Sequence, residues 1–81
     1  MLEKIESIMS AAKGKISAVR ELAQLNDLKV KYLGKNGEIT ALLKSLKDYS
    51  AEERPLVGKY INELRQKVEN LILETETELS R

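Results

Sequence analysis

The residues of this chain that are best suited to chemistry are lysines placed around two closely spaced glycines. Residues 31–40 read KYLGKNGEIT and contain Lys31, Gly34, Lys35, Asn36 and Gly37. Lysine pairs with phosphate groups, and glycine lets the backbone come close to a ligand. The stretch therefore either turns a corner between two helices or holds a negatively charged group.

Two known phosphate-binding loops contain glycines of this kind, and neither is predicted here. A nucleotide-binding P-loop needs a wider glycine spacing and ends in Lys-Ser or Lys-Thr. The stretch from Gly34 to Gly37 does match the GXXG loop of a KH domain. A KH domain also needs β-strands, and residues 41–79 contain no convincing strand pattern.

Enzyme chemistry has little support in the composition. The chain contains no cysteine and no histidine, and its serines have no evident activating partner. Glu52 and Glu53 are adjacent, so on a helix their carboxylates point in different directions. We therefore expect no catalytic residue, no metal site and no cofactor in these residues.

The sequence shows neither a signal peptide nor a membrane-spanning segment, and the cellular compartment is predicted from this. The first ten residues, MLEKIESIMS, carry acidic residues and no continuous apolar run, so they do not form a signal peptide. No segment approaches the roughly 20 apolar residues of a membrane span. We expect a cytoplasmic protein without a membrane partner.

Charge is distributed unevenly although the net charge is only +1. Residues 13–47 contain eight basic and three acidic residues, a net of +5, whereas residues 69–81 contain four acidic and one basic residue, a net of −3. These lysines either keep a helical rod soluble or contact a nucleic-acid backbone without reading its sequence. The candidates in or beside the glycine stretch are Lys29, Lys31, Lys35, Lys44 and Lys47.

Apolar periodicity predicts helices along the whole chain. Steps of three and four from Leu2 to Ala23 form a helical seam. A second apolar set extends this helix to about Leu33, with a break or bend allowed near residues 14–20 because Gly14 weakens the helix. Gly34 is predicted to end the helix in a left-handed conformation, with Gly37 as a second turn position. Residues 38–46 then form a short helix.

The last predicted helix spans about residues 51–79. Ser50 and Glu53 match a capping box, and Pro55 favours the first turn, so the helix begins between residues 50 and 55 with an irregular turn. Its apolar seam is convincing through Ile72, and residues 74–81 are expected to fray or to continue beyond this sequence. The predicted fold is all-α: one domain, residues 1–81, that forms a long antiparallel helical hairpin with a short intervening helix.

Several short motifs follow one another in a fixed order between residues 28 and 66. They are YLGKNG at 32–37, IT at 39–40, LK at 43–44, EERP at 52–55, Gly58 and INE at 61–63. Together they closely resemble the N-terminal region of the alpha subunits of bacterial phenylalanyl-tRNA synthetases. Asn36 stands where that family has a second lysine, and residues 1–27 and 67–81 fit more loosely.

This resemblance implies a tRNA-binding arm that projects from a synthetase body. The implied parent is a phenylalanine-tRNA ligase, an α2β2 enzyme whose ATP, magnesium and catalytic residues belong to a domain outside this sequence. We expect this segment to come from such a longer chain and to have no enzyme activity itself. The implied partners are phenylalanine-specific tRNA, the beta subunit and a second alpha subunit.

Residue roles follow from the resemblance together with the helical pattern. The candidate tRNA contacts are Lys29, Lys31, Lys35, Asn36, Lys44 and Lys47, with Lys59 and Arg65 as weaker ones. Tyr32 is expected in the core, Gly34 and Gly37 at the corner, Arg54 and Pro55 at the second corner, and Asn62 in a hydrogen bond between helices. The alternative function is a protein-interaction or self-associating coiled coil that does not bind RNA.

Overall fold

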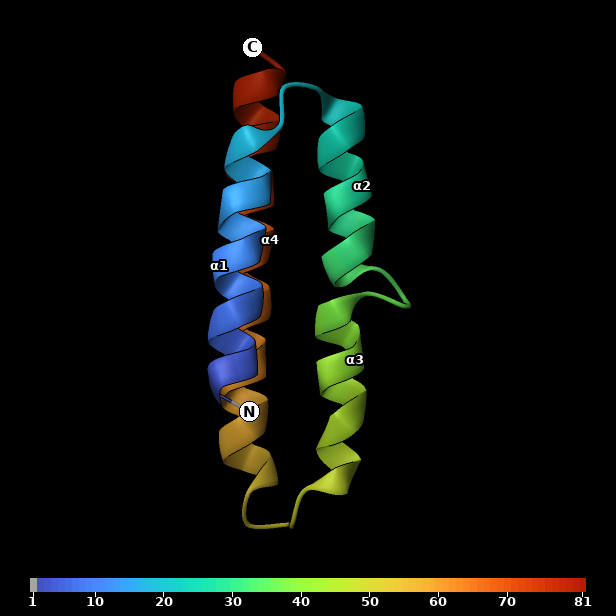
Figure 1. Ribbon diagram of the computed structural model, residues 1–81, viewed down its shortest axis with the longest axis vertical. Coiled ribbons are helices and arrows are strands. Elements are labelled where there is room, and N and C mark those ends of the chain that lie inside the picture. Colours follow the sequence, from blue (N-terminus) through green and yellow to red (C-terminus); the bar gives the residue numbers. More distant parts are fainter. Residues whose placement is uncertain (1) are drawn as a thin grey trace.

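The computed structural model describes residues 2–81 as an elongated all-α domain of 46 × 19 × 16 Å. In chain order its elements are α1 (Leu2–Ala18), α2 (Leu22–Leu33), α3 (Glu38–Lys44), the 3₁₀ helix η1 (Ser45–Asp48) and α4 (Arg54–Leu79). In Figure 1, α2 and α3 follow one another in a single column beside α1 and α4, and α4 runs along nearly the full length of the molecule. The all-α class and the elongated shape predicted from the sequence are confirmed.

The N-terminal region is not one helix that extends to about Leu33, because the break that the sequence allowed near residues 14–20 is present directly after Ala18. It forms two helices, because the chain turns back between Ala18 and Leu22. The Gln24 side-chain oxygen accepts hydrogen bonds from the backbone N–H groups of Arg20 (2.8 Å) and Glu21 (3.3 Å), which stabilises this turn. The predicted hairpin is therefore a bundle of three rods: α1, then α2 with α3, then α4.

Helix α1 itself continues through Gly14 without a break. The buried residues of α1 are Ile5, Ile8, Ala12 and Ile16, which recur in steps of three and four. Ala23, which the sequence pattern placed on the same seam, is exposed because it lies beyond the turn. The chain thus turns directly after the last buried residues of α1.

The core is a single aliphatic column along α4. Its most buried members on this helix are Ile61, Leu64, Val68 and Ile72, all at 3% exposure or less. They pack against α1 on one side and against Leu25, Tyr32, Ile39 and Leu42 from α2 and α3 on the other. The turn after Ala18 is favoured because it brings this second apolar set onto α4.

Both ends of α4 agree with the bounds predicted from the sequence. The irregular start is confirmed: Ser50 donates to the Glu53 carboxylate at 3.0 Å, and the helix begins at Arg54 with Pro55 in its first turn. The predicted end near residue 79 is confirmed, since α4 stays helical to Leu79, and of the two alternatives given for residues 74–81 fraying is not seen. Leu79 is half-buried against the core, which explains this extension. No helix within residues 2–81 is long and apolar enough to cross a membrane.

Candidate nucleic-acid interface

The corner between α2 and α3 is a tight turn made by Gly34, Lys35, Asn36 and Gly37. The N–H of Gly37 donates to the carbonyl of Gly34 at 2.8 Å, and the Thr40 hydroxyl donates to the same carbonyl at 2.7 Å. These bonds place Lys35 and Asn36 at the tip of the turn, where both are exposed. Figure 1 shows this loop projecting from the column formed by α2 and α3.

Both glycines are needed for close backbone approach and not for an unusual backbone conformation. The left-handed cap predicted at Gly34 is wrong, because Gly34 has φ −67° and Gly37 has φ −73°. A Cβ on Gly34 would lie 2.5 Å from the Val30 carbonyl oxygen, and one on Gly37 would lie 2.7 Å from the carbonyl of Tyr32. The corner thus requires the absence of a side chain at these two positions.

Tyr32 anchors this corner in the core. Tyr32 is 1% exposed, and the Lys31 ammonium lies 5.8 Å from the centre of its ring. Burial raises the pKa of the Tyr32 phenol, the nearby Glu38 carboxylate raises it further, and the Lys31 charge lowers it. The side chain is therefore held as a neutral phenol next to an exposed lysine.

The raised pKa predicts an alkaline loss of stability that depends on Tyr32. Its ordinary value is 10.0, so the folded chain binds the phenolic proton more tightly than the unfolded chain does. Its contribution is fully present below that pH and is lost as the pH rises through the folded-state pKa. In thermal unfolding followed by circular dichroism, Tyr32→Phe should retain more of its stability above about pH 10 than the unmodified chain. Equal alkaline losses in the two proteins would contradict this.

The eight candidate tRNA contacts are all exposed, but the structure does not gather them into one patch. They are distributed over α2 (Lys29, Lys31), the turn (Lys35, Asn36), α3 (Lys44), η1 (Lys47) and α4 (Lys59, Arg65). Lys29 and Lys31 are two residues apart, which separates them by about 200° around α2. Lys29 borders α4 beside Glu69 and Glu76, whereas the Lys31 ammonium lies over the ring of Tyr32. The strongest grouping is therefore Lys31, Lys35 and Asn36 at the corner.

Two candidates have acidic neighbours that weaken them as contacts for a polyanion. The Arg65 guanidinium lies 3.9 Å from the Glu69 carboxylate, and Lys29 faces two carboxylates across its groove. Sequence reasoning missed these neighbours because they lie on a different helix or one turn further on. The net charge of the 69–81 segment was the one signal that pointed to them.

The second corner is braced by Arg54. Its Nε donates to the carbonyls of Leu46 (3.2 Å) and Tyr49 (3.1 Å), and one terminal nitrogen donates to the carbonyl of Lys47 (3.3 Å). These bonds tie the end of η1 to the start of α4. Asn62, in contrast, is exposed and forms no side-chain hydrogen bond within residues 2–81, so the predicted bond between helices is wrong. It follows buried Ile61 by one position, which turns it about 100° away from the core.

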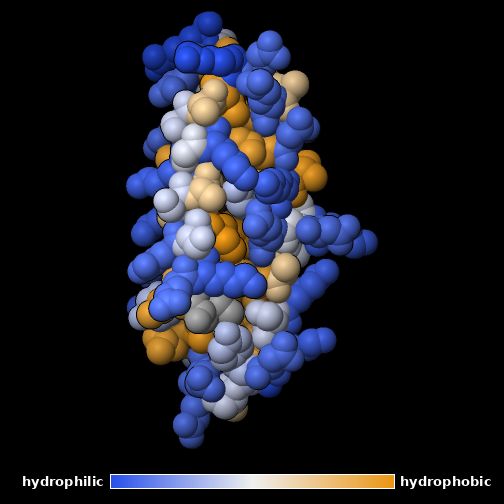
Figure 2. All heavy atoms as spheres, in the orientation of Figure 1, coloured by the Kyte–Doolittle hydropathy of each residue, from blue (hydrophilic) through white to orange (hydrophobic). Residues whose placement is uncertain are grey.

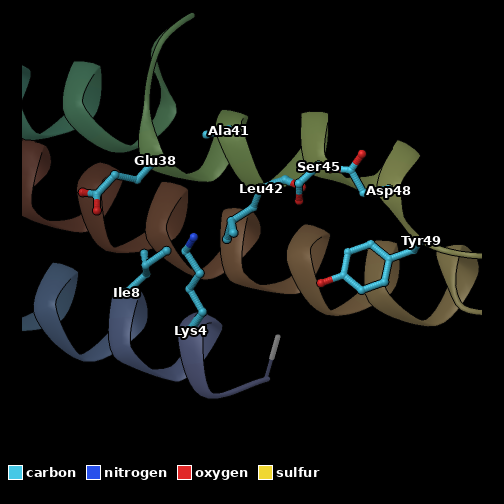
Figure 3. A pocket seen from close by; sticks show the side chains of 8 residues that line it. All are labelled: Lys4, Ile8, Glu38, Ala41, Leu42, Ser45, Asp48 and Tyr49. Carbon is cyan, nitrogen blue, oxygen red and sulfur yellow. The ribbon is translucent and has the colours of Figure 1, made fainter.

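A groove of about 510 Å³ lies between α1 and the α3–η1 segment (Figure 3). Its charged members are Lys4, Glu38 and Asp48, so carboxylates outnumber the ammonium group. The Ser45 hydroxyl in this groove donates to the carbonyl of Leu42 at 2.6 Å and is thereby occupied. The groove is a poorer surface for phosphate groups than the exposed lysines at the corner.

Comparison with known proteins shows the family to which the chain belongs. A family model described as the N-terminal domain of class II aminoacyl-tRNA synthetases matches residues 20–81. The chain belongs to this family. No solved structure matches the chain.

Individual relatives are more specific. The chain is 47% identical over 79 residues to the phenylalanine–tRNA ligase alpha subunit of Hydrogenovibrio crunogenus, covering 98% of this chain and 24% of that protein. The same subunit of Geotalea daltonii is 46% identical over 72 residues, with 89% and 21% covered. That of Clostridium acetobutylicum is 42% identical over 74 residues, with 91% and 22% covered. The chain thus spans less than a quarter of the length of these relatives, and the resemblance seen in the sequence is confirmed.

Proposed function

We propose that this chain is the tRNA-contacting arm of a phenylalanine–tRNA ligase alpha subunit. The observation that carries the proposal is the family match over residues 20–81 together with relatives that are named as this subunit. In this proposal, ATP, magnesium and aminoacylation belong to a catalytic domain of the same enzyme. The beta subunit and a second alpha subunit are its protein partners, and the cytoplasm is its compartment.

The proposed contact is between the exposed corner and the phosphate backbone of tRNA. Lys35 lies at the tip of the turn, Lys31 precedes it on α2, and Lys44 is exposed on α3. Figure 2 shows hydrophilic side chains projecting outward on the side of α2 and α3. Lysines on phosphate groups position the nucleic acid without reading its sequence. The arm should therefore orient tRNA and leave discrimination to other parts of the enzyme.

The proposal is tested by fluorescence-anisotropy titration of labelled phenylalanine tRNA at about 50 and about 200 mM salt. If three phosphates are neutralised, affinity should fall about 20- to 40-fold over this fourfold change in salt. Replacing Lys31, Lys35 and Lys44 together with glutamate should abolish saturable binding at the lower salt concentration. The far-ultraviolet circular dichroism spectrum should stay unchanged, because all three side chains are exposed.

A matched control separates a local contact from a general charge effect. Replacing Lys4, Lys13 and Lys67 with glutamate changes the net charge by the same amount, and these exposed lysines lie on α1 and α4. This control should keep most of the affinity. Equal losses in both variants would reduce the contact to a nonspecific charge effect, and no binding of the unmodified chain at about 50 mM salt would overturn the proposal.

A further inference from the structure

An apolar strip is exposed along the junction of α2 and α4. Leu22 on α2 is 46% exposed, and Leu73 on α4 is 59% exposed. Two adjoining hollows of about 230 and 370 Å³ share Lys29, Ile72 and Glu76 and together form one groove between these helices. We call it the α2–α4 groove; the residues that line it include Leu22, Lys29, Leu33, Glu69, Leu73 and Glu76. Exposed apolar strips with charged borders are typical of interaction sites.

The charges of the α2–α4 groove exclude RNA as its best occupant. The residues that line the two hollows include two carboxylates, Glu69 and Glu76, and one cation, Lys29, and the surrounding 69–81 segment has a net charge of −3 from four acidic residues and one basic residue. A phosphate backbone would be repelled there. A protein surface with apolar residues and both signs of charge would be accepted, and the groove itself is such a surface.

The levels of these residues along the bundle determine how two copies would fit. Lys29 and Glu76 line both hollows, and the larger hollow is also lined by Glu69 and Leu73. These four side chains therefore lie at neighbouring heights along the bundle. In an antiparallel pair related by a two-fold axis across the groove, Lys29 would meet Lys29, and Glu69 would meet Glu76. Such like-charge pairs oppose association.

A parallel pair removes this conflict. With the two-fold axis along the bundle, α2 of one copy lies on α4 of the other at the same level. Lys29 then faces Glu76 of the other copy, and Leu33, which lines the same hollow as Leu73, faces Leu73 of the other copy. We infer that the α2–α4 groove binds a second copy of this chain in a parallel two-fold arrangement. Such an interface is isologous, so the same patch must complement itself.

This inference does not rest on the proposed function. The turn that carries Lys35, and Lys31 beside it, lie outside the α2–α4 groove. A dimer would therefore leave the proposed tRNA contact accessible. Because only a few side chains are involved, we expect a weak dimer, measurable between about 10 µM and about 1 mM chain.

Sedimentation equilibrium over this concentration range gives the first test. The apparent mass should rise from 9.2 kDa toward twice that value. Leu73→Asp should keep the chain monomeric throughout. Leu56→Asp is the matched control, because Leu56 is similarly exposed (56%) on the same helix but lies outside the groove; it should still dimerise. A monomer at all concentrations overturns the inference, and so does dissociation by Leu56→Asp with no effect of Leu73→Asp.

Charge exchange tests the predicted pair. Lys29→Glu and Glu76→Lys should each weaken self-association at least about tenfold, and an equimolar mixture of the two should recover it as a heterodimer. A mixture that stays monomeric contradicts the Lys29–Glu76 contact. If Leu73→Asp leaves the mass unchanged but weakens tRNA binding, the groove belongs to RNA and the inference is wrong.

A spin label tests the parallel orientation. The chain has no cysteine, so Glu52→Cys, exposed at the second corner, carries a single label. With bundles 16–19 Å thick, a parallel pair places two labels about 20 Å apart. An antiparallel pair centred on Leu73 places them about 60 Å apart, at about 1.5 Å per residue. A distance near the second value in double electron–electron resonance overturns the parallel arrangement.

Discussion

Replacing Tyr32 with alanine is expected to lower the free energy of unfolding by about 3–5 kcal/mol. Tyr32 is 1% exposed and is the largest of the fully buried side chains. It lies in the last turn of α2 and packs in the core between α2, α3 and α4. Since small domains have a total stability of about 5–15 kcal/mol, this loss leaves little of the folded state. Urea unfolding followed by circular dichroism measures it.

The matched control for this change is Tyr32→Phe at neutral pH. It keeps the ring and removes only the hydroxyl, so the free energy of unfolding should change by less than about 1.5 kcal/mol. The difference between the two variants isolates the cavity left by the ring. If Tyr32→Ala stays within about 1 kcal/mol of the unmodified chain, the ring does not anchor the corner.

The most predictable part of the fold is α4. Its apolar residues repeat in steps of three and four over many turns, and they correspond to the buried Ile61, Leu64, Val68 and Ile72. Local start signals, Ser50 and Pro55, mark its beginning. Both kinds of information are local in the sequence, which is why the periodicity predicts them well.

The turn after Ala18 could not be predicted from periodicity alone. Ile16, Val19 and Ala23 keep the helical spacing across it, so the pattern favours one continuous helix. The structure turns there because Leu25 and Tyr32 then reach α4 and are buried. Glu21 followed by Gln24 was the local capping signal, but it competes with an uninterrupted seam and gains its meaning only from packing between helices.

The candidate site shows the same limit. Exposure of the lysines follows from their type, and burial of Tyr32 follows from its apolar neighbours. The placement of Lys29 beside Glu69 and Glu76 depends on how α2 packs on α4. Likewise, the conformation of Gly34 depends on the tight approach of the turn to Val30. Such through-space neighbours have no signature in the spacing of residues along one chain.

Gly37→Ala is expected to destabilise the domain by about 1–3 kcal/mol, although φ at this position suits alanine. The new Cβ would lie 2.7 Å from both carbonyl atoms of Tyr32 and 3.0 Å from the Gly34 nitrogen. These are backbone atoms, so relief requires the whole turn to move. The hydrogen bond from the Gly37 N–H to the Gly34 carbonyl would lengthen with it. Urea unfolding should report the loss.

Gly14→Ala makes the same chemical change where no such contact exists. Nothing lies within 4 Å of a Cβ at Gly14, which is exposed within α1. It should therefore stabilise the domain by about 0.5–1 kcal/mol, the usual gain of alanine over glycine in a helix. Opposite signs for the two substitutions would assign the effect at Gly37 to steric contact with the corner. A gain at both positions would mean that the turn opens freely, and that Lys35 is not held in the place the structure gives it.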